Sequence, residues 1–179
     1  MRVVAGKSRG LKLTSPPENV RPTLSRVKEA IFSSIGADLT GKTFLDAFCG
    51  TGQIGIEALS RGASFSTFID IDITTAKKNL DKLKSNLIFA ELNNFKLIKK
   101  DLRLNTEKIN ADIAYIDPPY DMNLDFLQFI NVNNMLILEQ DKNTDSSIIN
   151  LPKNLELFKE KTYAHTKVYF FKIACSGAY

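Results

Sequence analysis

The stretch LDAFCGTGQIGIEAL, Leu45–Leu59, decides the fold of this 179-residue chain. Its apolar start is typical of a buried strand, and IGIEAL is typical of a helix, which Gly62 would end. Between them, Gly50, Gly52 and Gly55 follow the G-x-G-x-x-G spacing. Such glycines allow a tight turn and let a ligand approach the backbone, and the following helix offers free N–H groups. Because the glycines follow a strand and open a helix, they predict a nucleotide-binding loop.

The segments after this loop alternate between strand and helix patterns. Strand patterns begin with the glycine-loop strand and cover residues 42–48, 65–71, 94–100, 111–117 and 135–139. A helical stripe of apolar residues runs from Ile73 to Leu87, and a short helix is predicted at 124–130. Residues 155–173 are typical of a hairpin that turns near His165. This alternation predicts an α/β fold, a parallel sheet with helices on both faces, and the hairpin adds antiparallel strands at one edge.

The first 35 residues differ from the rest of the chain in charge. RVVAGKSRGLKLT, residues 2–14, predicts two short strands around a turn, and Thr23 is predicted to cap a helix that Gly36 ends. The region holds two glutamates and seven basic residues, Arg2, Lys7, Arg9, Lys12, Arg21, Arg26 and Lys28. The other 144 residues are close to neutral. A basic front end on a neutral body favours a polyanionic partner, although a merely solvated surface would carry the same charge.

Three aspartates follow the predicted strands. Asp70 ends the second strand, 18 residues beyond Gly52, where a carboxylate can accept bonds from the two hydroxyls of a ribose. NAD and S-adenosylmethionine both carry such a ribose. Asp46 favours the second ligand, because it could face the ammonium of a methionine tail, whereas NAD would bring a pyrophosphate close to it; alternatively, Asp46 caps the amides of the glycine loop. Asp101, after the third strand, could bond the adenine amino group or be a solvated acid.

YIDPPYD, Tyr115–Asp121, ends the fourth predicted strand at the same edge of the sheet. Two consecutive prolines lack N–H groups and fix two φ angles, so this loop is rigid and rich in acceptors. The exocyclic amine of a nucleobase is a poor nucleophile, and its two N–H groups need acceptors. Asp117 offers one acceptor and the carbonyl of Pro118 another, while Tyr120 could stack on an extruded base. The alternative is a strand-ending turn with Tyr120 packed inward.

With LDAFCGTGQIGIEALSRGA and RPTLSRVKEAIF, the DPPY motif resembles the RsmD family of 16S ribosomal RNA guanine-N2 methyltransferases. The resemblance covers nearly the whole chain. It implies a Rossmann-like class I methyltransferase with a mostly parallel seven-stranded sheet, an antiparallel last strand, and a small amino-terminal hairpin and helix. It also implies that S-adenosylmethionine is bound by Asp46, Gly50, Gly52, Asp70 and Asp101. The catalytic loop that it implies consists of Asp117, Pro118, Pro119 and Tyr120.

The resemblance further implies a division of labour along the chain. Residues 1–35 are expected to be an RNA-binding extension, and residues 36–179 the methyltransferase domain. The expected partner is 16S ribosomal RNA or the small ribosomal subunit, and we expect a monomer. Two cysteines and one histidine are too few for a Cys/His zinc site. Because no apolar segment follows the basic amino terminus and no run approaches the roughly 18 residues of a membrane helix, the cytoplasm is the expected compartment.

Three other functions fit parts of the pattern. An adenine-N6 DNA methyltransferase shares the DPPY signature, but it usually carries a separate target-recognition region, for which 179 residues leave no room. A non-catalytic RNA-binding module has no need of an intact glycine loop and an intact DPPY. An NAD oxidoreductase leaves DPPY unexplained. The expected mechanism is direct transfer, in which the guanine N2 attacks the methyl carbon in line with the departing sulfur.

Overall fold

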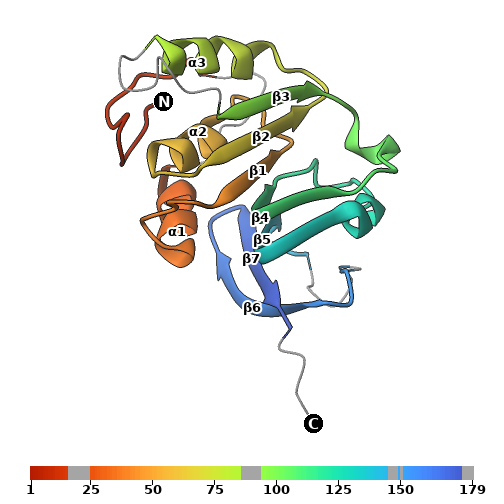
Figure 1. Ribbon diagram of the computed structural model, residues 1–179. Coiled ribbons are helices and arrows are strands. Elements are labelled where there is room, and N and C mark those ends of the chain that lie inside the picture. The colour runs from red at the N-terminus through yellow and green to blue at the C-terminus, as the bar shows by residue number, and fades with distance from the viewer. Residues whose placement is uncertain (16–24, 86–93, 145–148, 150, 175–179) are drawn as a thin grey trace.

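Seven strands form one mixed sheet in the order β3-β2-β1-β4-β5-β7-β6 (Figure 1). The structure is a computed structural model, which describes residues 1–15, 25–85, 94–144, 149 and 151–174. The strands are β1 Thr43–Ala47, β2 Phe65–Asp70, β3 Phe95–Lys99, β4 Ile109–Ile116, β5 Ile130–Asp141, β6 Leu155–Thr162 and β7 Thr166–Ile173. The first five strands pair in parallel, and β7 is antiparallel to both β5 and β6. The predicted α/β fold and the antiparallel last strand are confirmed.

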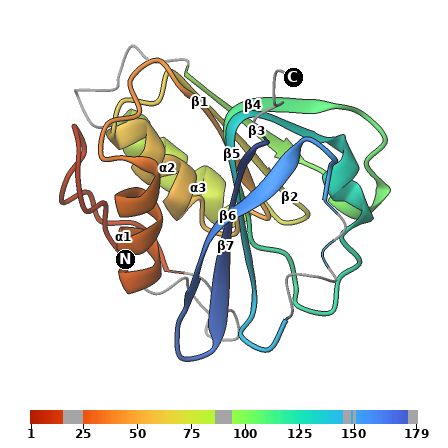
Figure 2. The same ribbon diagram turned by 90° about the horizontal axis from the view of Figure 1, so that it is seen from below.

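The α-helices of the described residues lie on one face of the sheet, as Figure 2 shows. They are α1 Ser25–Ile35, α2 Gln53–Ser60 and α3 Thr74–Lys84. The other face carries two short 3-10 segments, η1 Leu102–Leu104 and η2 Asp125–Phe129. The prediction of helices on both faces was therefore wrong in this respect, because the connection between β4 and β5 has two prolines near its start, which disfavour a helix interior, and its helical part is only the five-residue segment η2. Within the described ranges, no helix is both long and apolar enough to cross a membrane.

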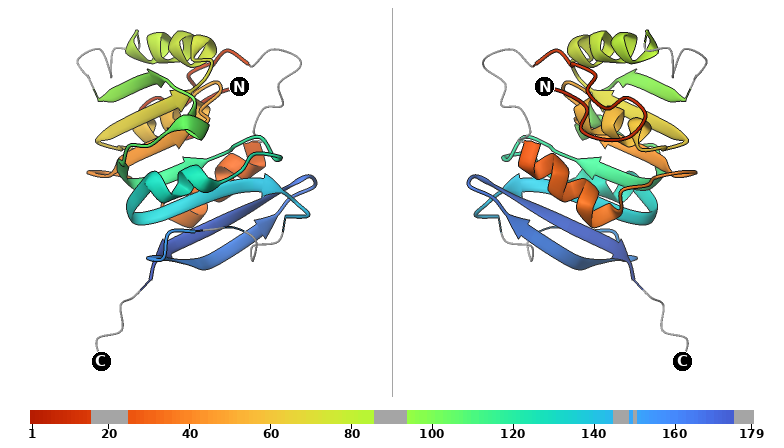
Figure 3. Two further views of the ribbon diagram at one scale, coloured as in Figure 1. Left: turned by 90° about the vertical axis from the view of Figure 1, so that its right-hand side faces the viewer. Right: turned by 90° about the vertical axis from the view of Figure 1, so that its left-hand side faces the viewer.

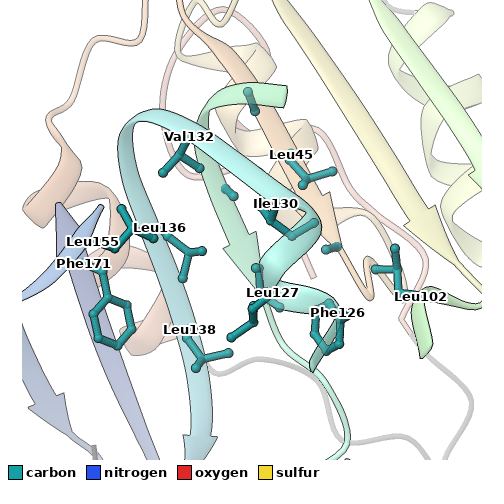
Figure 4. Packing of buried hydrophobic residues seen from close by; sticks show 14 of the residues in the cluster. Leu45, Leu102, Phe126, Leu127, Ile130, Val132, Leu136, Leu138, Leu155 and Phe171 are labelled. Carbon is teal, nitrogen blue, oxygen red and sulfur yellow. The ribbon is translucent and has the colours of Figure 1, made fainter. Parts of the chain in front are cut away.

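Alternation along the strands divides the core between the two faces. On the face covered by α1 and α2, buried strand residues are Phe44, Ile113, Tyr115, Ile137 and Phe170. On the opposite face they are Leu45, Ala114, Leu136, Leu138 and Phe171, which pack with η2 (Figure 4). Successive side chains of a strand point to opposite faces. Residues two positions beyond the first set, Asp46, Asp117 and Glu139, therefore belong to the α-helical face at the strand ends.

Residues 1–14 form the predicted hairpin, but without continuous strands. Val3 N donates to Leu11 O over 3.0 Å, and Leu13 N donates to Met1 O over 3.0 Å. The regular pairing is limited to one isolated antiparallel bridge between Arg2 and Lys12. Val3 and Leu13 are buried in the same hydrophobic cluster as residues of α2 and α3. The hairpin therefore lies against the body of the protein (Figure 3).

Glu57 of α2 fixes this hairpin in place. Its buried carboxylate accepts bonds from the backbone N–H groups of Val4 (2.8 Å) and Ala5 (2.9 Å). It also forms ion pairs with Lys28 of α1 (3.2 Å) and with Arg61 (3.0 Å). A buried carboxylate is tolerated only when it is paired and hydrogen-bonded, and Glu57 has both kinds of partner. The division of the chain at residue 35 stays a prediction, and Glu57 joins the two sides of it.

Candidate active site

A cavity of about 600 Å³ lies at the carboxyl ends of β1, β2, β4 and β5. Eight residues that the sequence predicted for cofactor binding or catalysis line it, namely Asp46, Gly50, Asp70, Asp101, Asp117, Pro118, Pro119 and Tyr120. Gly52 was also predicted to bind the cofactor, but it does not line this cavity. One continuous space therefore joins the glycine loop to the DPPY loop, as expected for strand ends at one edge of a sheet.

The glycine loop turns through three residues in the left-handed region, Phe48 (φ 60°), Gly50 (φ 52°) and Gly52 (φ 74°). A left-handed phenylalanine is uncommon, and such strain concentrates at functional sites. Gly50 N donates to Asp70 Oδ2 over 2.7 Å, so the acid at the end of β2 holds the loop. A Cβ on Gly55 would stand 2.3 Å from the Phe68 ring. Gly55 therefore allows α2 to pack closely on β2, while Gly50 faces the cavity.

Asp46 is a buried carboxyl group beneath the glycine loop. Its side chain is 1% exposed, and its Oδ2 accepts a bond from Gly55 N over 2.8 Å. Burial raises the pKa of Asp46 to about 8, although the Gly55 N–H opposes this shift. The capping contact that the sequence allowed as an alternative is thus present. Because Asp46 also lines the cavity, the cap and a ligand contact are compatible.

We expect Asp46→Asn to stabilise the protein at alkaline pH. The folded-state pKa of about 8 lies above the ordinary value, so the contribution of Asp46 to stability falls as pH rises from about 4 to 8. Asparagine keeps an acceptor for Gly55 and cannot ionise. The melting temperature of the variant should exceed that of the wild type at pH 8 by about 2–4 °C, the equivalent of roughly 1 kcal/mol in a chain of this size, and the gain should shrink towards pH 5.

Asp112 provides a control of opposite sign for this prediction. Thr43 N donates to Asp112 Oδ2 over 2.8 Å, and this bond leads the causes that lower the pKa of Asp112. Its stabilising contribution is present above the ordinary pKa and is lost as the pH falls. Asp112→Asn should therefore lower the melting temperature at pH 8 and lose this effect in acid. An Asp46→Asn variant that behaved in the same way as Asp112→Asn would contradict the role of burial.

Asp101 lines the cavity but is already engaged. Arg103 donates to both of its oxygens, with Nε at 2.9 Å from Oδ1 and a terminal nitrogen 2.6 Å from Oδ2. This contact leads the causes that lower the pKa of Asp101. An adenine amino group could bond Asp101 only beside Arg103 or in its place. Asp101 is thus a paired acid at the cavity wall, and its contact with the cofactor stays a prediction.

The DPPY loop continues directly from β4. Asp117 is half-buried, and its backbone N lies 3.4 Å from the Ala47 carbonyl of β1. Burial raises the pKa of Asp117 well above its usual range, the nearby charges of Glu139 and Asp46 add to the rise, and a bond from Tyr115 opposes it. Tyr120 is 44% exposed and lines the cavity, so the alternative in which it packs inward is wrong.

Sequence reasoning missed one corner of the cavity, beyond Asp117. Glu139 of β5 is 5% exposed, and its Oε2 accepts a bond from the Tyr115 hydroxyl over 2.6 Å. Its Oε1 accepts a bond from the Thr166 hydroxyl over 3.0 Å. His165, which the sequence placed in a hairpin turn, also lines the cavity. The sequence pattern that could have indicated Glu139 is its position on β5. It lies two residues after Ile137, which pairs with Tyr115.

The predicted RNA-binding residues fall into three groups. Exposed side chains on the hairpin are Arg2, Lys7, Arg9 and Lys12. Lys28 was predicted wrongly, because it is 3% exposed, pairs with Glu57 and donates to the Arg2 carbonyl over 2.8 Å. It therefore cannot reach a phosphate. Arg21 and the predicted cap Thr23 lie outside the described residues. Arg26 lies in the first turn of α1, where only the backbone is described.

A second set of exposed lysines, missed in the sequence, lies on α3. The set consists of Lys77, Lys78, Lys82 and Lys84. Lys82 Nζ donates to Thr14 Oγ1 over 2.8 Å, so this helix lies beside the end of the hairpin. The net charge of residues 36–179 is near zero because acids elsewhere in this region balance these lysines. The net charge therefore gave no indication of a basic helix.

Comparison with known proteins places this chain in one family over most of its length. The model of the family described as "Conserved hypothetical protein 95" matches residues 1–172. A protein of Haemophilus influenzae named ribosomal RNA small subunit methyltransferase D is 36% identical over 172 residues, which cover 90% of this chain and 88% of that protein. Its namesake in Buchnera aphidicola (from Acyrthosiphon pisum) is 32% identical over 182 residues, 94% of this chain and 91% of the relative.

The fold agrees with this result. The solved structure of a putative methyltransferase, yhhF, from Escherichia coli superposes with a TM-score of 0.78 and 25% identity, covering 98% of this chain and 99% of that one. The Rossmann-like class I methyltransferase architecture expected from the sequence is thereby confirmed. The chain belongs to the family described as Conserved hypothetical protein 95, the RsmD family that the motifs resemble.

Proposed function

We propose that this protein is an S-adenosylmethionine-dependent methyltransferase that methylates the exocyclic N2 amino group of a guanine in 16S ribosomal RNA. The observation that carries the proposal is the single cavity that joins the glycine loop and Asp70 to Asp117 and Tyr120. A cofactor at one end would stand beside a nucleobase at the other. The names of the two relatives, both ribosomal RNA small subunit methyltransferases, support RNA as the substrate.

The donor set of the cavity fits a cationic cofactor. Asp46, Asp70 and Asp117 line one cavity, and burial raises the pKa of Asp46 and of Asp117. A positively charged ligand would relieve the repulsion among these carboxyl groups, whereas the pyrophosphate of NAD would increase it. S-adenosylmethionine has a sulfonium and an ammonium group, and when bound it supplies an electrophilic methyl group. We infer that Asp70 holds its ribose and that Asp46 and Gly50 adjoin its methionine part.

The DPPY loop would bind and orient the target amine. Asp117 and the carbonyl of Pro118 can each accept one N–H bond, and Pro119 keeps their spacing rigid. These contacts strengthen as the nitrogen becomes tetrahedral and positive, so they stabilise the transition state more than the bound substrate. Tyr120 is exposed at the cavity and can stack on the base. The loop's part in the reaction is therefore orientation, without a covalent enzyme intermediate.

The proposal is tested by mapping the methylated base. The protein is incubated with S-adenosylmethionine carrying a labelled methyl group and with naked 16S RNA, assembled small subunits or duplex DNA. We expect label in N2-methylguanine of the ribosomal substrates, and far slower labelling with an Asp117→Ala control. Label in DNA adenine would favour the adenine-N6 rival. Binding of RNA without transfer to any substrate, together with no binding of S-adenosylmethionine, would favour a non-catalytic module.

We further propose that residues 1–35 form an RNA-binding extension of a methyltransferase domain at 36–179. Replacing Lys7, Arg9 and Lys12 together by alanine should weaken RNA binding and leave cofactor binding unchanged. Each lost phosphate contact removes about 0.7–0.9 from the slope of log affinity against log salt, so the slope should flatten by roughly 2–3 units. Binding is measured by titration at several salt concentrations.

The matched control removes three exposed lysines from the other end of the sheet, Lys142, Lys153 and Lys159. The net charge then changes by the same amount, and the slope should stay near that of the wild type. If both triple variants changed the slope equally, the effect would be one of total charge and not of the hairpin.

A further inference from the structure

Three carboxyl groups stand on neighbouring strands at one side of the cavity. Asp46 lies on β1, Asp117 directly follows β4, and Glu139 lies on β5. In the register of the sheet, Tyr115 pairs with Asp46 on one side and with Ile137 on the other. Tyr115 is buried on the same face of the sheet. The central strand thus places a phenol hydroxyl among the acids of its two neighbours.

The Tyr115 hydroxyl lies near two of these acids. It donates to Glu139 Oε2 over 2.6 Å, and it lines the same cavity as Asp117, whose pKa it lowers. A hydroxyl has one proton, so it can fully satisfy only one carboxylate at a time. Besides burial, the charge of Glu139 favours a protonated Asp117, and the bond from Tyr115 favours an ionised one. The position of one hydroxyl proton is therefore linked to the charge of Asp117.

Glu139 is held so that it stays within reach of Tyr115. Its other oxygen accepts a bond from the Thr166 hydroxyl over 3.0 Å, and the same hydroxyl lies 2.8 Å from the Gln140 carbonyl. Thr166 is the first residue of β7. The two carboxylate oxygens of Glu139 thus contact hydroxyls of β4 and β7, and the Thr166 hydroxyl divides its one proton between Glu139 and the Gln140 carbonyl.

We propose that Tyr115 and Glu139 are positioning residues that set the proton occupancy of Asp117, with the Tyr115 hydroxyl donating to Asp117 while Asp117 is ionised and to Glu139 once Asp117 is protonated. The proposal rests on the proposed methyl transfer to an amine. An ionised Asp117 is the acceptor that the incoming amine needs, and the same group must accept a proton afterwards. The tyrosine hydroxyl would serve both states by rotation about one bond.

The lone pair of the amine nitrogen forms the new N–C bond, and the pair of the breaking C–S bond stays on sulfur. The nitrogen, now positive, gives one N–H proton to the Asp117 carboxylate and becomes neutral. The Tyr115 hydroxyl then turns its own proton from Asp117 to Glu139. Release of the Asp117 proton to water restores the starting state.

Other titratable groups face this corner and could affect the same titration. Asp46 of β1 and Cys49 of the glycine loop approach from one side, and Tyr163 and His165 from the turn between β6 and β7 on the other. Glu139 contributes to the raised pKa of Tyr163 after burial, so Tyr163 is a neighbour of Glu139. The described part of α1 adds only the apolar Val27 to the cavity lining.

The test is a carbon-13 NMR titration of aspartate carboxyl groups in the whole protein without ligands, with Asp117 assigned from an Asp117→Asn variant. Tyr115→Phe should raise the midpoint of Asp117, because the bond to the ionised form is lost. Glu139→Gln should lower it, because a neighbouring negative charge is lost. Each shift should be on the order of one pH unit. Tyr163→Phe removes a hydroxyl near Glu139 that is not among the groups that shift the pKa of Asp117. This variant should leave the midpoint of Asp117 near the wild-type value.

Single-turnover methylation against pH supplies a second readout. The acidic limb of the rate profile should move up in Tyr115→Phe and down in Glu139→Gln, in step with the NMR midpoints. No shift in either variant, or shifts in the same direction, would overturn the proposal, because a role only in packing moves neither midpoint. The titration needs no substrate. If the Asp117 midpoint shifted in opposite directions in the two variants but the protein methylated no RNA, the proposed function would be refuted. The link between the Tyr115 hydroxyl and the charge of Asp117 would still stand.

Discussion

Replacing Asp117 by alanine is expected to slow methyl transfer in a single turnover by at least ~100-fold, the scale of losing one transition-state contact. The cofactor should still bind, because Asp70 and the glycine loop lie at the other end of the cavity. The amine would lose the acceptor whose contact strengthens as the nitrogen gains charge. Rapid-quench experiments with saturating enzyme measure the rate, and calorimetry measures binding of S-adenosylmethionine.

Two further variants test whether the slower rate comes from loss of the Asp117 acceptor or from loss of any acid in this loop. Asp117→Asn keeps one acceptor oxygen, so its rate should lie between those of alanine and the wild type. Asp121→Ala removes an exposed acid of the same loop and should leave the rate near that of the wild type. Because burial raises the pKa of Asp117, its removal should not lower the melting temperature. An Asp117→Ala enzyme with a normal rate would refute the orienting role.

Asp70→Ala should weaken binding of S-adenosylmethionine by about 1.5–3 kcal/mol, the range for a hydrogen bond to a charged group. The carboxylate accepts bonds from Gly50 N (2.7 Å) and from Asp72 N (3.1 Å), so the ribose would meet an acceptor that is already fixed in position. RNA affinity measured without the cofactor should barely change. Calorimetry of the wild type and the variant compares the cofactor affinities.

The control for this variant is Asp72→Ala. Asp72 lies two residues further on, and its carboxylate accepts a bond from Thr74 N at the start of α3 instead of holding the glycine loop. Its loss should affect the start of the helix more than the affinity for the cofactor. If both variants weakened binding equally, the effect would come from negative charge in general. If Asp70→Ala bound S-adenosylmethionine with unchanged affinity, the proposed contact between Asp70 and the ribose would be wrong.

Most strands of the sheet could be predicted from the sequence because they have apolar runs of their own, whereas the largely exposed β6 was predicted only as part of the hairpin. The antiparallel pairing at one edge also followed from the hairpin pattern together with the family resemblance, whereas the place of β7 between β5 and β6 comes from the structure. The second face of the sheet was not readable in the same way. Residues 124–130 show a helical pattern, but five residues of helix cannot sustain α-helical hydrogen bonds, and η2 Asp125–Phe129 is a 3-10 segment.

The lining of the cavity was predictable for acids that directly end a strand. Asp70 and Asp117 are such residues, and both line the cavity. Glu139 was missed because its importance depends on the register between β4 and β5. Lys28 was misjudged because its partner, Glu57, belongs to another helix, and only the packing of the hairpin over α2 buries the pair. Side-chain contacts between different helices and strands, such as these two, are the features that are hardest to predict from a single sequence.

The strand order also determines when during synthesis this protein can become an enzyme. Strand β7 is made after β6, yet it lies between β5 and β6. While the chain emerges from a ribosome, β5 therefore has an open edge, and β6 has no place in the sheet until β7 arrives. Thr166, which begins β7, also completes the bonds around Glu139. The corner beside Asp117 is thus assembled last, so a nascent chain would carry the cofactor half of its site before the half that completes the reaction.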